Sequence, residues 1–154
     1  MPLNLKDGAL LRQQCYVDGR WLDAADGATV EVTNPATGAA LGTVPRLGVA
    51  ETRAAIDAAG AAFPAWAART AKDRAALLRK WYELMLAHAD DLATLMTAEQ
   101  GKPLAEARGE VVYAASFIEW FAEEGKRLYG DVIPGHQPDK RIFVLRQPVV
   151  SSRR

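Results

Sequence analysis

The sequence predicts an α+β fold, in which short strands near the N-terminus are followed by three long helices and one further strand. Two observations support this fold class. Up to residue 45, apolar residues alternate in short runs separated by turn residues, whereas from residue 49 they recur every three or four positions. After the last helical stretch, a run of branched residues at 141–145 returns to a strand-like pattern.

The first strands are expected between residues 15 and 45. Residues 16–21, Tyr-Val-Asp-Gly-Arg-Trp, place Asp-Gly between two arms that contain apolar residues. This dipeptide favours a tight hairpin because both turn positions tolerate a positive φ. Residues 28–32 alternate and predict another strand, 34–38 read Asn-Pro-Ala-Thr-Gly and predict a turn, and 41–44 predict a further strand.

Helical periodicity begins at Val49, and Pro64 lies inside this first helical pattern, so we expect the helix to kink or end there. Residues 70–73, Thr-Ala-Lys-Asp, resemble a capping box with Asp in place of the usual Glu, and they predict the start of a second helix. The Gly-Lys-Pro sequence at 101–103 predicts its end.

The third helix is expected to run from Pro103 to about Tyr129. Residues 131–139 contain two prolines and are predicted to form a loop, whereas 141–145 are predicted to form a strand. This strand follows three helices and has no obvious partner nearby in the sequence. We therefore expect its partners among the early strands, in residues outside this chain or in another subunit.

The composition is that of an ordinary globular chain and argues against several classes of partner. Of the 154 residues, 49% are hydrophobic and 25% are charged, and 19 Lys and Arg balance 19 Asp and Glu. A net charge of zero argues against nucleic acid or an anionic membrane as the main partner. No apolar run approaches the roughly 18 residues of a membrane span. The first 14 residues lack the layout of a secretory signal, so we expect a cytoplasmic location.

Few side chains carry a recognisable chemistry. Cys15 is the single cysteine, has no base beside it in the sequence and is expected to be a structural thiol. His88 is expected in a core or interface and His136 in an exposed loop. Glu123 and Glu124 point about 100° apart on a helix, which favours a solvated face over a catalytic pair. Neither a glycine-rich phosphate loop nor metal-ligand spacing is present, so no metal site is predicted.

Longer motifs carry more information. They are NPATG at 34–38, AAFPAW at 61–66, LATLMTAEQGKPLAEARGEV at 92–111, SFIEWFAEEGKRLYGDVIPGH at 116–136 and DKR at 139–141. Together these motifs closely resemble the aldehyde dehydrogenase superfamily and, within it, the bacterial NAD(P)-dependent succinate-semialdehyde dehydrogenases. The resemblance runs from about residue 11 to residue 149 and is most specific at 116–136.

The resemblance implies a homo-oligomeric enzyme that oxidises a small aldehyde to an acid with NAD or NADP. In the family, a cysteine thiolate adds to the aldehyde, hydride passes to a coenzyme held in a Rossmann-like domain, and a glutamate-activated water hydrolyses the thioester. An asparagine side chain helps to hold the oxyanion. None of these three catalytic residues has a counterpart here. We therefore expect an N-terminal segment that is inactive alone and binds no coenzyme.

A second interpretation is a non-catalytic interaction module that pairs with full-length subunits. The choice between NAD and NADP, and the identity of the aldehyde, stay open in the sequence.

The resemblance also implies candidate site residues. The third helix lines the substrate tunnel in the family, and the matching positions are Gly109, Tyr113 and Phe117, spaced four apart. Ordinary helix packing is the alternative role for these three residues. In some members a monovalent cation lies near the positions of Thr33 and Glu99.

The resemblance divides the chain into an N-terminal arm at 1–14, a family segment at 15–149 and a tail at 150–154. Strand 141–145 resembles the start of the family's oligomerisation sheet. After Gln-Pro-Val at 147–149 the family continues with Gly-Val and a strand leading to a Thr-Pro-Trp-Asn type motif, whereas this chain reads Val-Ser-Ser-Arg-Arg. Deletion of one G from codons for Val-Gly-Val-Val-Ala-Ala can give Val-Val-Ser-Ser-Arg-Arg, so we expect a frameshifted tail.

Overall fold

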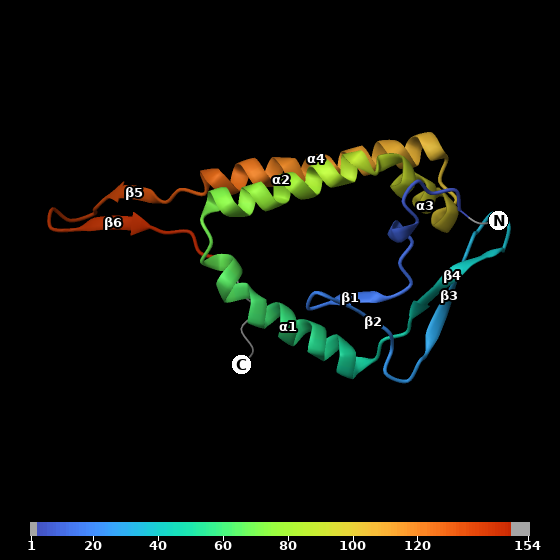
Figure 1. The fold of residues 1–154 in the computed structure, drawn as a ribbon. Coiled ribbons are helices and arrows are strands. Elements are labelled where there is room, and N and C mark those ends of the chain that lie inside the picture. The colour runs from blue at the N-terminus through green and yellow to red at the C-terminus, as the bar shows by residue number, and fades with distance from the viewer. Residues whose placement is uncertain (1–2, 149–154) are drawn as a thin grey trace.

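The computed structural model describes residues 3–148 and has the α+β architecture that the sequence predicts (Figure 1). Two hairpins precede four α-helices, and a third hairpin follows them. In chain order, the elements are η1 (Gly8–Leu10), β1 (Cys15–Val17), β2 (Arg20–Leu22), β3 (Thr29–Thr33), β4 (Ala40–Pro45), α1 (Val49–Ala67), α2 (Ala71–Ala87), α3 (Ala89–Gln100), α4 (Leu104–Glu124), η2 (Gly125–Arg127), β5 (Asp131–Pro134) and β6 (Arg141–Val144).

The hairpins form three separate two-stranded antiparallel sheets. Between β1 and β2 the turn residues Asp18 and Gly19 have φ values of 49° and 75°, so the expected Asp-Gly hairpin is confirmed. Between β3 and β4 the register shifts at Val32 and Thr33. The Asn34 carbonyl then accepts hydrogen bonds from the amides of Thr37 and Gly38, which confirms the predicted turn.

Helix α1 begins after Gly48, whose N–H donates to the Glu51 carboxylate at 3.1 Å. The helix continues through Pro64 for one further turn and ends at Ala67. A proline removes one helical hydrogen bond and crowds the carbonyl four residues earlier, which explains why helices rarely extend far beyond one. Helix α2 then begins after Thr70, at the predicted capping sequence 70–73. The Asp73 N–H donates to the Thr70 hydroxyl oxygen at 3.1 Å.

Residues 3–148 contain four α-helices where the sequence indicated three. The expected single helix from 71 to 100 is broken at His88, which ends α2 and precedes α3 with φ −105° and ψ 17°. Asp90 and Asp91 lie in the first turn of α3, where acidic side chains favour a helix N-terminus. Helix α3 ends at Gln100, and Gly101 follows it in the left-handed region with φ 76°, which confirms the predicted stop at 101–103.

Two further expectations, for residues 125–134, are wrong. Helix α4 ends at Glu124 and is followed by the turn η2, so it does not extend to Tyr129. Residues 131–134, expected in a loop, form strand β5, and β5 pairs with β6 in the register Val132 to Phe143. The final strand therefore has a partner nearby in sequence. The outer edges of β5 and β6 form no ladder within residues 3–148.

Helices α2 and α4 lie side by side, and α3 contacts the N-terminal half of α4 (Figure 1). Their contact is lined by small side chains, since the buried apolar residues of α2, α3 and α4 are alanines and one valine. These are Ala75, Ala89, Ala93, Ala98, Ala107, Val111, Ala115 and Ala122. The accessible surface is 11745 Å², about 1.5 times the ~7,600 Å² expected for a compact protein of 16.7 kDa. Most large apolar side chains therefore contact little of this chain.

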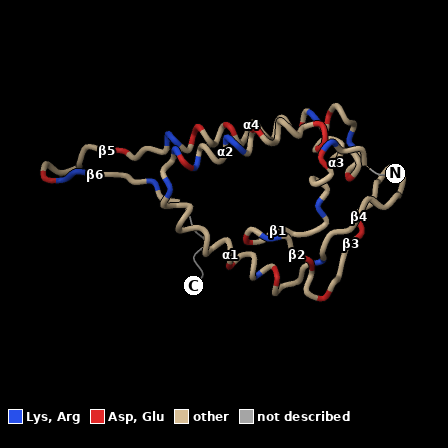
Figure 2. The backbone as a smooth tube through the Cα atoms, in the orientation of Figure 1, with Lys and Arg blue, Asp and Glu red and all other residues tan. Residues whose placement is uncertain are grey.

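Lysine and arginine alternate with aspartate and glutamate along the helices, and no long stretch of one sign appears (Figure 2). Several opposite charges pair across elements. Arg79 of α2 lies 3.0 Å from the Glu119 carboxylate of α4, and Arg108 of α4 lies 3.0 Å from Asp90 of α3. Within residues 3–148, no helix is both long and apolar enough to cross a membrane.

Candidate functional site

Helix α4 carries an aromatic face on the side away from its alanine contact. Tyr113 and Phe117 lie four residues apart, and their rings meet edge to face with centroids 4.9 Å apart. Trp120 and Phe121 continue the same face one turn later. All four are exposed, from 47% for Phe117 to 64% for Tyr113. Since α4 meets its neighbours through Ala107, Val111, Ala115 and Ala122, packing within this chain does not account for the aromatic face.

The aromatic face forms one wall of a hollow of about 530 Å³. Its lining comprises Tyr113, Ser116, Phe117, Glu119, Trp120, Phe121, Glu123 and Arg127. Apolar rings edged by an arginine and two glutamates suit a small molecule with an apolar body and a polar end. The structure therefore brings together two of the three predicted substrate residues, Tyr113 and Phe117.

Gly109, the third predicted residue, lies one turn before Tyr113 and is absent from the lining of the hollow. It is exposed, and a Cβ added at this position would have no atom within 4 Å. Any role for Gly109 in substrate binding thus needs contacts beyond those in the hollow.

The structure brings together the two segments of the suggested cation position. Thr33 ends β3 and Glu99 lies in the last turn of α3, and both are exposed. The neighbouring turn contacts the end of α3, because a Cβ at Gly101 would lie 3.2 Å from Cγ of Pro35. Among the described residues, no group of three or more His, Cys, Asp or Glu side chains could hold a metal ion.

Cys15, Glu123 and Glu124, which the sequence analysis considered as catalytic residues, lie away from the aromatic hollow or in local ion pairs. Cys15 is half-buried in β1, opposite Leu22. Glu123 and Glu124 do not face each other, since each carboxylate pairs with a separate cation three residues later, at 2.7 Å to Lys126 and 2.5 Å to Arg127. The hydrogen bond from Lys126 lowers the pKa of Glu123 below its usual value. These pairs are consistent with the expectation that the two glutamates are not a catalytic pair.

A buried carboxylate holds the N-terminal arm, which the sequence did not indicate. Asp91 is 4% exposed, and its two carboxylate oxygens each accept a backbone N–H, from Lys6 and from Asp7, at 2.9 Å. These two backbone donors hold the pKa of Asp91 below its usual value. The only signal in the sequence was the Asp-Asp pair in the predicted second helix, which is too common to indicate contacts 84 and 85 residues away.

Replacing Asp91 with asparagine is expected to release the arm. Because the folded pKa of Asp91 is lowered, its contribution to arm docking is present above the unfolded pKa, about 3.9, and is lost as the pH falls through the folded value. The neutral amide has one acceptor oxygen for two donors. The protection factors of the Lys6 and Asp7 amides, which compare their exchange with that of an unstructured peptide at the same pH, should therefore be high in the parent at neutral pH and low below the folded pKa of Asp91. In Asp91→Asn they should be low at both pH values.

The matched control is Asp90→Asn. Asp90 is exposed, and its carboxylate accepts hydrogen bonds from the side-chain cations of Arg108 and Lys6, which lower its pKa. Its loss should leave the Lys6 and Asp7 amides protected. If the Lys6 and Asp7 amides stayed protected in Asp91→Asn, the Asp91 carboxylate would not be what holds the N-terminal arm.

Residues 3–148 contain no phosphate-binding turn of the type that holds a dinucleotide coenzyme in a Rossmann-like domain. Phosphate-binding sites of the Rossmann type join a parallel strand to a helix through a glycine-rich turn. Here the strands of residues 3–148 pair only in antiparallel hairpins, and Gly48 is the single glycine at the connection from β4 to α1.

The order and arrangement of the strands and helices agree with comparison to known proteins. Residues 21–151 match the model of the aldehyde dehydrogenase family. The chain belongs to this family.

Within the family, the similar proteins include semialdehyde dehydrogenases. The glutarate-semialdehyde dehydrogenase of Pseudomonas putida is 67% identical over 147 residues, covering 96% of this chain and 31% of the relative. The NADP-dependent succinate-semialdehyde dehydrogenase of Escherichia coli is 65% identical over 147 residues, covering 96% of this chain and 30% of the relative. An aldehyde dehydrogenase structure from Brucella melitensis biovar abortus 2308 superposes with a TM-score of 0.94 at 64% identity, covering 95% of this chain and 30% of that chain.

The chain thus spans about 30% of the length of these relatives and has the N-terminal part of the aldehyde dehydrogenase fold.

Proposed function

We propose that this chain is the N-terminal segment of an NAD(P)-dependent semialdehyde dehydrogenase of the cytoplasm, and that the 154 residues alone do not oxidise aldehydes. The identity of 65–67% to succinate- and glutarate-semialdehyde dehydrogenases over 147 residues carries the proposal. The chain's own residues support the proposed lack of activity. Cys15 is the single cysteine, and among residues 3–148 no basic side chain forms a hydrogen bond to its thiol.

The direct test follows coenzyme reduction by the purified chain. Succinate semialdehyde and glutarate semialdehyde are each supplied with NAD⁺ or NADP⁺, and absorbance at 340 nm is recorded beside the intact Pseudomonas putida relative. We expect the relative to reduce coenzyme and the 154-residue chain to match the protein-free blank. Aldehyde-dependent reduction by the chain that disappears in Cys15→Ser would overturn the proposal.

We further propose that Tyr113 and Phe117 contact the aldehyde in the intact enzyme and that Gly109 leaves room beside them. Support comes from the hollow of about 530 Å³ that the two rings line. In the full-length Pseudomonas putida relative, alanine at the position aligned with Tyr113 should raise KM about tenfold, equivalent to about 1.4 kcal/mol, with little change in kcat.

Phenylalanine at the Tyr113 position keeps the ring and is expected to retain the parental KM. A drop in kcat with unchanged KM, or a loss of activity that phenylalanine fails to rescue, would favour a purely structural role for this ring.

A second candidate function, an interaction module that pairs with full-length subunits, is favoured by one feature. The β5–β6 hairpin extends away from the helices (Figure 1), and Val132 and Phe143 on it are 73% and 68% exposed. Unpaired strand edges with apolar side chains readily pair with another chain. Co-expression with a full-length relative followed by size-exclusion chromatography tests this function, and separate elution of the two chains would remove it.

The tail at 150–154 lies outside the described residues. We propose a frameshift as its origin, and the nucleotide sequence decides it: coding for a Thr-Pro-Trp-Asn-like motif should resume downstream in the parental frame.

A further inference from the structure

The chain contains three Asp-Gly pairs, and the structure holds them differently. They are Asp7-Gly8 in the N-terminal arm, Asp18-Gly19 in the turn between β1 and β2, and Asp26-Gly27 in the connection from β2 to β3. Glycine has no Cβ to shield its backbone nitrogen. In an Asp-Gly pair this nitrogen can therefore attack the side-chain carboxyl carbon of the preceding aspartate and form a five-membered succinimide ring, provided that both groups are free to approach.

Hydrogen bonds restrain the first and the third pair. The Asp7 carboxylate accepts the Ala9 N–H at 2.9 Å, and the Asp26 carboxylate accepts the Ala28 N–H at 2.9 Å. The nitrogen that would attack Asp26 is also bound, because the Gly27 N–H donates to the backbone carbonyl three residues before it, at 2.9 Å. These contacts must break before a succinimide ring can close at either site.

The Asp18-Gly19 pair lacks both restraints. Within residues 3–148, the Asp18 carboxylate accepts no hydrogen bond and the Gly19 N–H donates none, and both residues are exposed. Asp18 is also the single non-glycine residue of this range with a positive φ, at 49°. A left-handed backbone costs an L-residue conformational free energy, which makes the turn easier to open.

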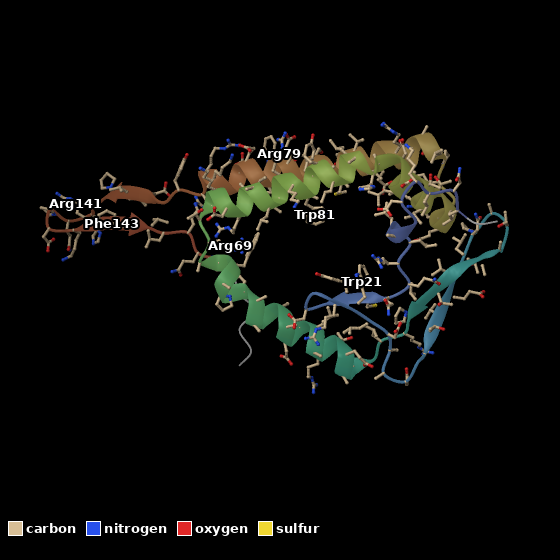
Figure 3. All side chains as sticks on the ribbon, viewed as in Figure 1. Trp21, Arg69, Arg79, Trp81, Arg141 and Phe143 are labelled. Carbon is tan, nitrogen blue, oxygen red and sulfur yellow. The ribbon has the colours of Figure 1, made fainter. Side chains whose placement is uncertain are left out.

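The β1–β2 hairpin has room and freedom to open. Its two strands have three residues each and, within residues 3–148, pair only with each other, and such isolated hairpins are marginally stable in water. Trp21 projects from β2 on the side that faces α2 (Figure 3), and its ring meets Tyr16 of β1 with centroids 5.2 Å apart. A hollow of about 380 Å³ lies between the turn and the alanines of α1, so the turn can move without displacing the helix.

We propose that Asp18 is a modification site at which the folded chain forms isoaspartate, the substrate of protein-isoaspartate methyltransferases. The Gly19 nitrogen loses its proton and bonds to Cγ of Asp18, and the carboxyl hydroxyl leaves with that proton as water. A second water then opens the ring at the former backbone carbonyl of Asp18. The main chain now runs through Cβ and Cγ, and because one water is lost and one is gained, the mass is unchanged and no other reactant is needed.

The modification is expected to open the hairpin. Isoaspartate adds one carbon to the main chain inside a two-residue turn, and the geometry of that turn sets the register of the two strands. Tyr16 and Trp21 would then no longer stand opposite each other. After chromatographic separation of the modified chain, we expect the amides of these two residues to lose their protection from hydrogen exchange, with exchange in α2 and α4 unchanged.

The test ages the purified 154-residue chain at neutral pH and physiological temperature. Trypsin cuts after Lys6, Arg12, Arg20 and Arg46, so the three Asp-Gly pairs fall in separate peptides. Electron-based fragmentation, which breaks the Cα–Cβ bond of isoaspartate, then locates the modification in each peptide. We expect isoaspartate at position 18 to exceed that at positions 7 and 26 by about tenfold or more, because hydrogen bonds must break first at the other two sites.

The same chain unfolded in urea is the matched control. The restraining hydrogen bonds are absent there, so the three pairs should convert at similar rates. A second readout is methylation of the aged, folded chain by a purified protein-isoaspartate methyltransferase with a radiolabelled methyl donor. Asp18→Glu should remove most of this signal, because glutamate closes the corresponding six-membered ring more slowly, whereas Asp26→Glu should leave the signal unchanged.

Three outcomes would overturn the inference. Equal conversion of the three pairs in the folded chain would show that the hydrogen bonds do not select the site. Conversion at position 18 in urea but not in the folded chain would show that the hairpin protects its turn. Methylation that survives Asp18→Glu would place the modification elsewhere. A modified chain whose Tyr16 and Trp21 amides stay protected would refute the expected opening of the hairpin.

Discussion

Replacing Ala115 with glutamate is expected to disrupt the layer formed by α2, α3 and α4. Ala115 is 0% exposed and lies in the alanine-lined face of α4. A fully buried position has no room for a glutamate side chain, so the substitution combines overpacking with burial of a charge. Comparable uncompensated buried charges destabilise proteins by about 3–5 kcal/mol. Thermal unfolding followed at 222 nm should show a lower midpoint or the loss of a cooperative transition.

The neighbouring Ala114→Glu is the matched control. Ala114 is exposed on the same helix, and glutamate is a good helix former, so this variant should unfold like the parent. Equal stability of the two variants would show that α4 does not contact α2 and α3 through Ala115.

Replacing Gly130 with alanine is expected to open the β5–β6 hairpin. A Cβ on Gly130 would overlap the carbonyl oxygen of Val144, which belongs to the backbone of β6 and cannot move without disturbing the pairing of Asp131 with Val144. The expected result is faster hydrogen exchange at the Val132 and Phe143 amides, with the helical signal at 222 nm unchanged. A fully protected hairpin in this variant would show that the chain enters β5 along another path.

Gly125→Ala is the control for this substitution. A Cβ at Gly125 would have no atom within 4 Å, and the residue has φ −57°, which alanine adopts without strain. The same chemical change five residues earlier should therefore leave the hairpin closed.

Features set by local chemistry were predictable from the sequence. The Asp18-Gly19 turn, the Thr70 cap and the Gly101 stop each depend on the conformational preference or hydrogen bonding of one or two residues, and each is confirmed. The aldehyde dehydrogenase family was also correctly identified, because long motifs such as 116–136 carry more information than composition or periodicity.

Features set by contacts between distant segments were not predictable. Strand β5 contains Pro134 and a single apolar pair, Val132 and Ile133, so its pattern resembled a loop, and only pairing with β6 makes it a strand. The break at His88 was hidden because Leu84 and Leu92 continue the helical spacing across it.

The apolar stripe of the second helix was also only partly informative. Leu77, Leu78, Trp81, Leu84 and Met85 all recur at helical spacing in the sequence, whereas in the structure Leu78 and Met85 are half-buried and the other three are exposed. A sequence pattern shows that a residue avoids water but does not say which neighbour covers it. In the same way, the four-residue spacing placed Tyr113 and Phe117 on one face of the helix. It did not show whether the two rings contact a substrate or pack against another part of the protein.

The contact between Asp91 and the N-terminal arm has a consequence for the order of folding. The residues that leave the ribosome first, Lys6 and Asp7, find their partner only after 84 further residues have been synthesised. The hairpins and α1 can form from neighbouring contacts before then. The arm therefore docks late and, among the hydrogen bonds between side chains and backbone within residues 3–148, closes the largest loop. An arm that is bound to Asp91 therefore indicates that helix α3 has already formed.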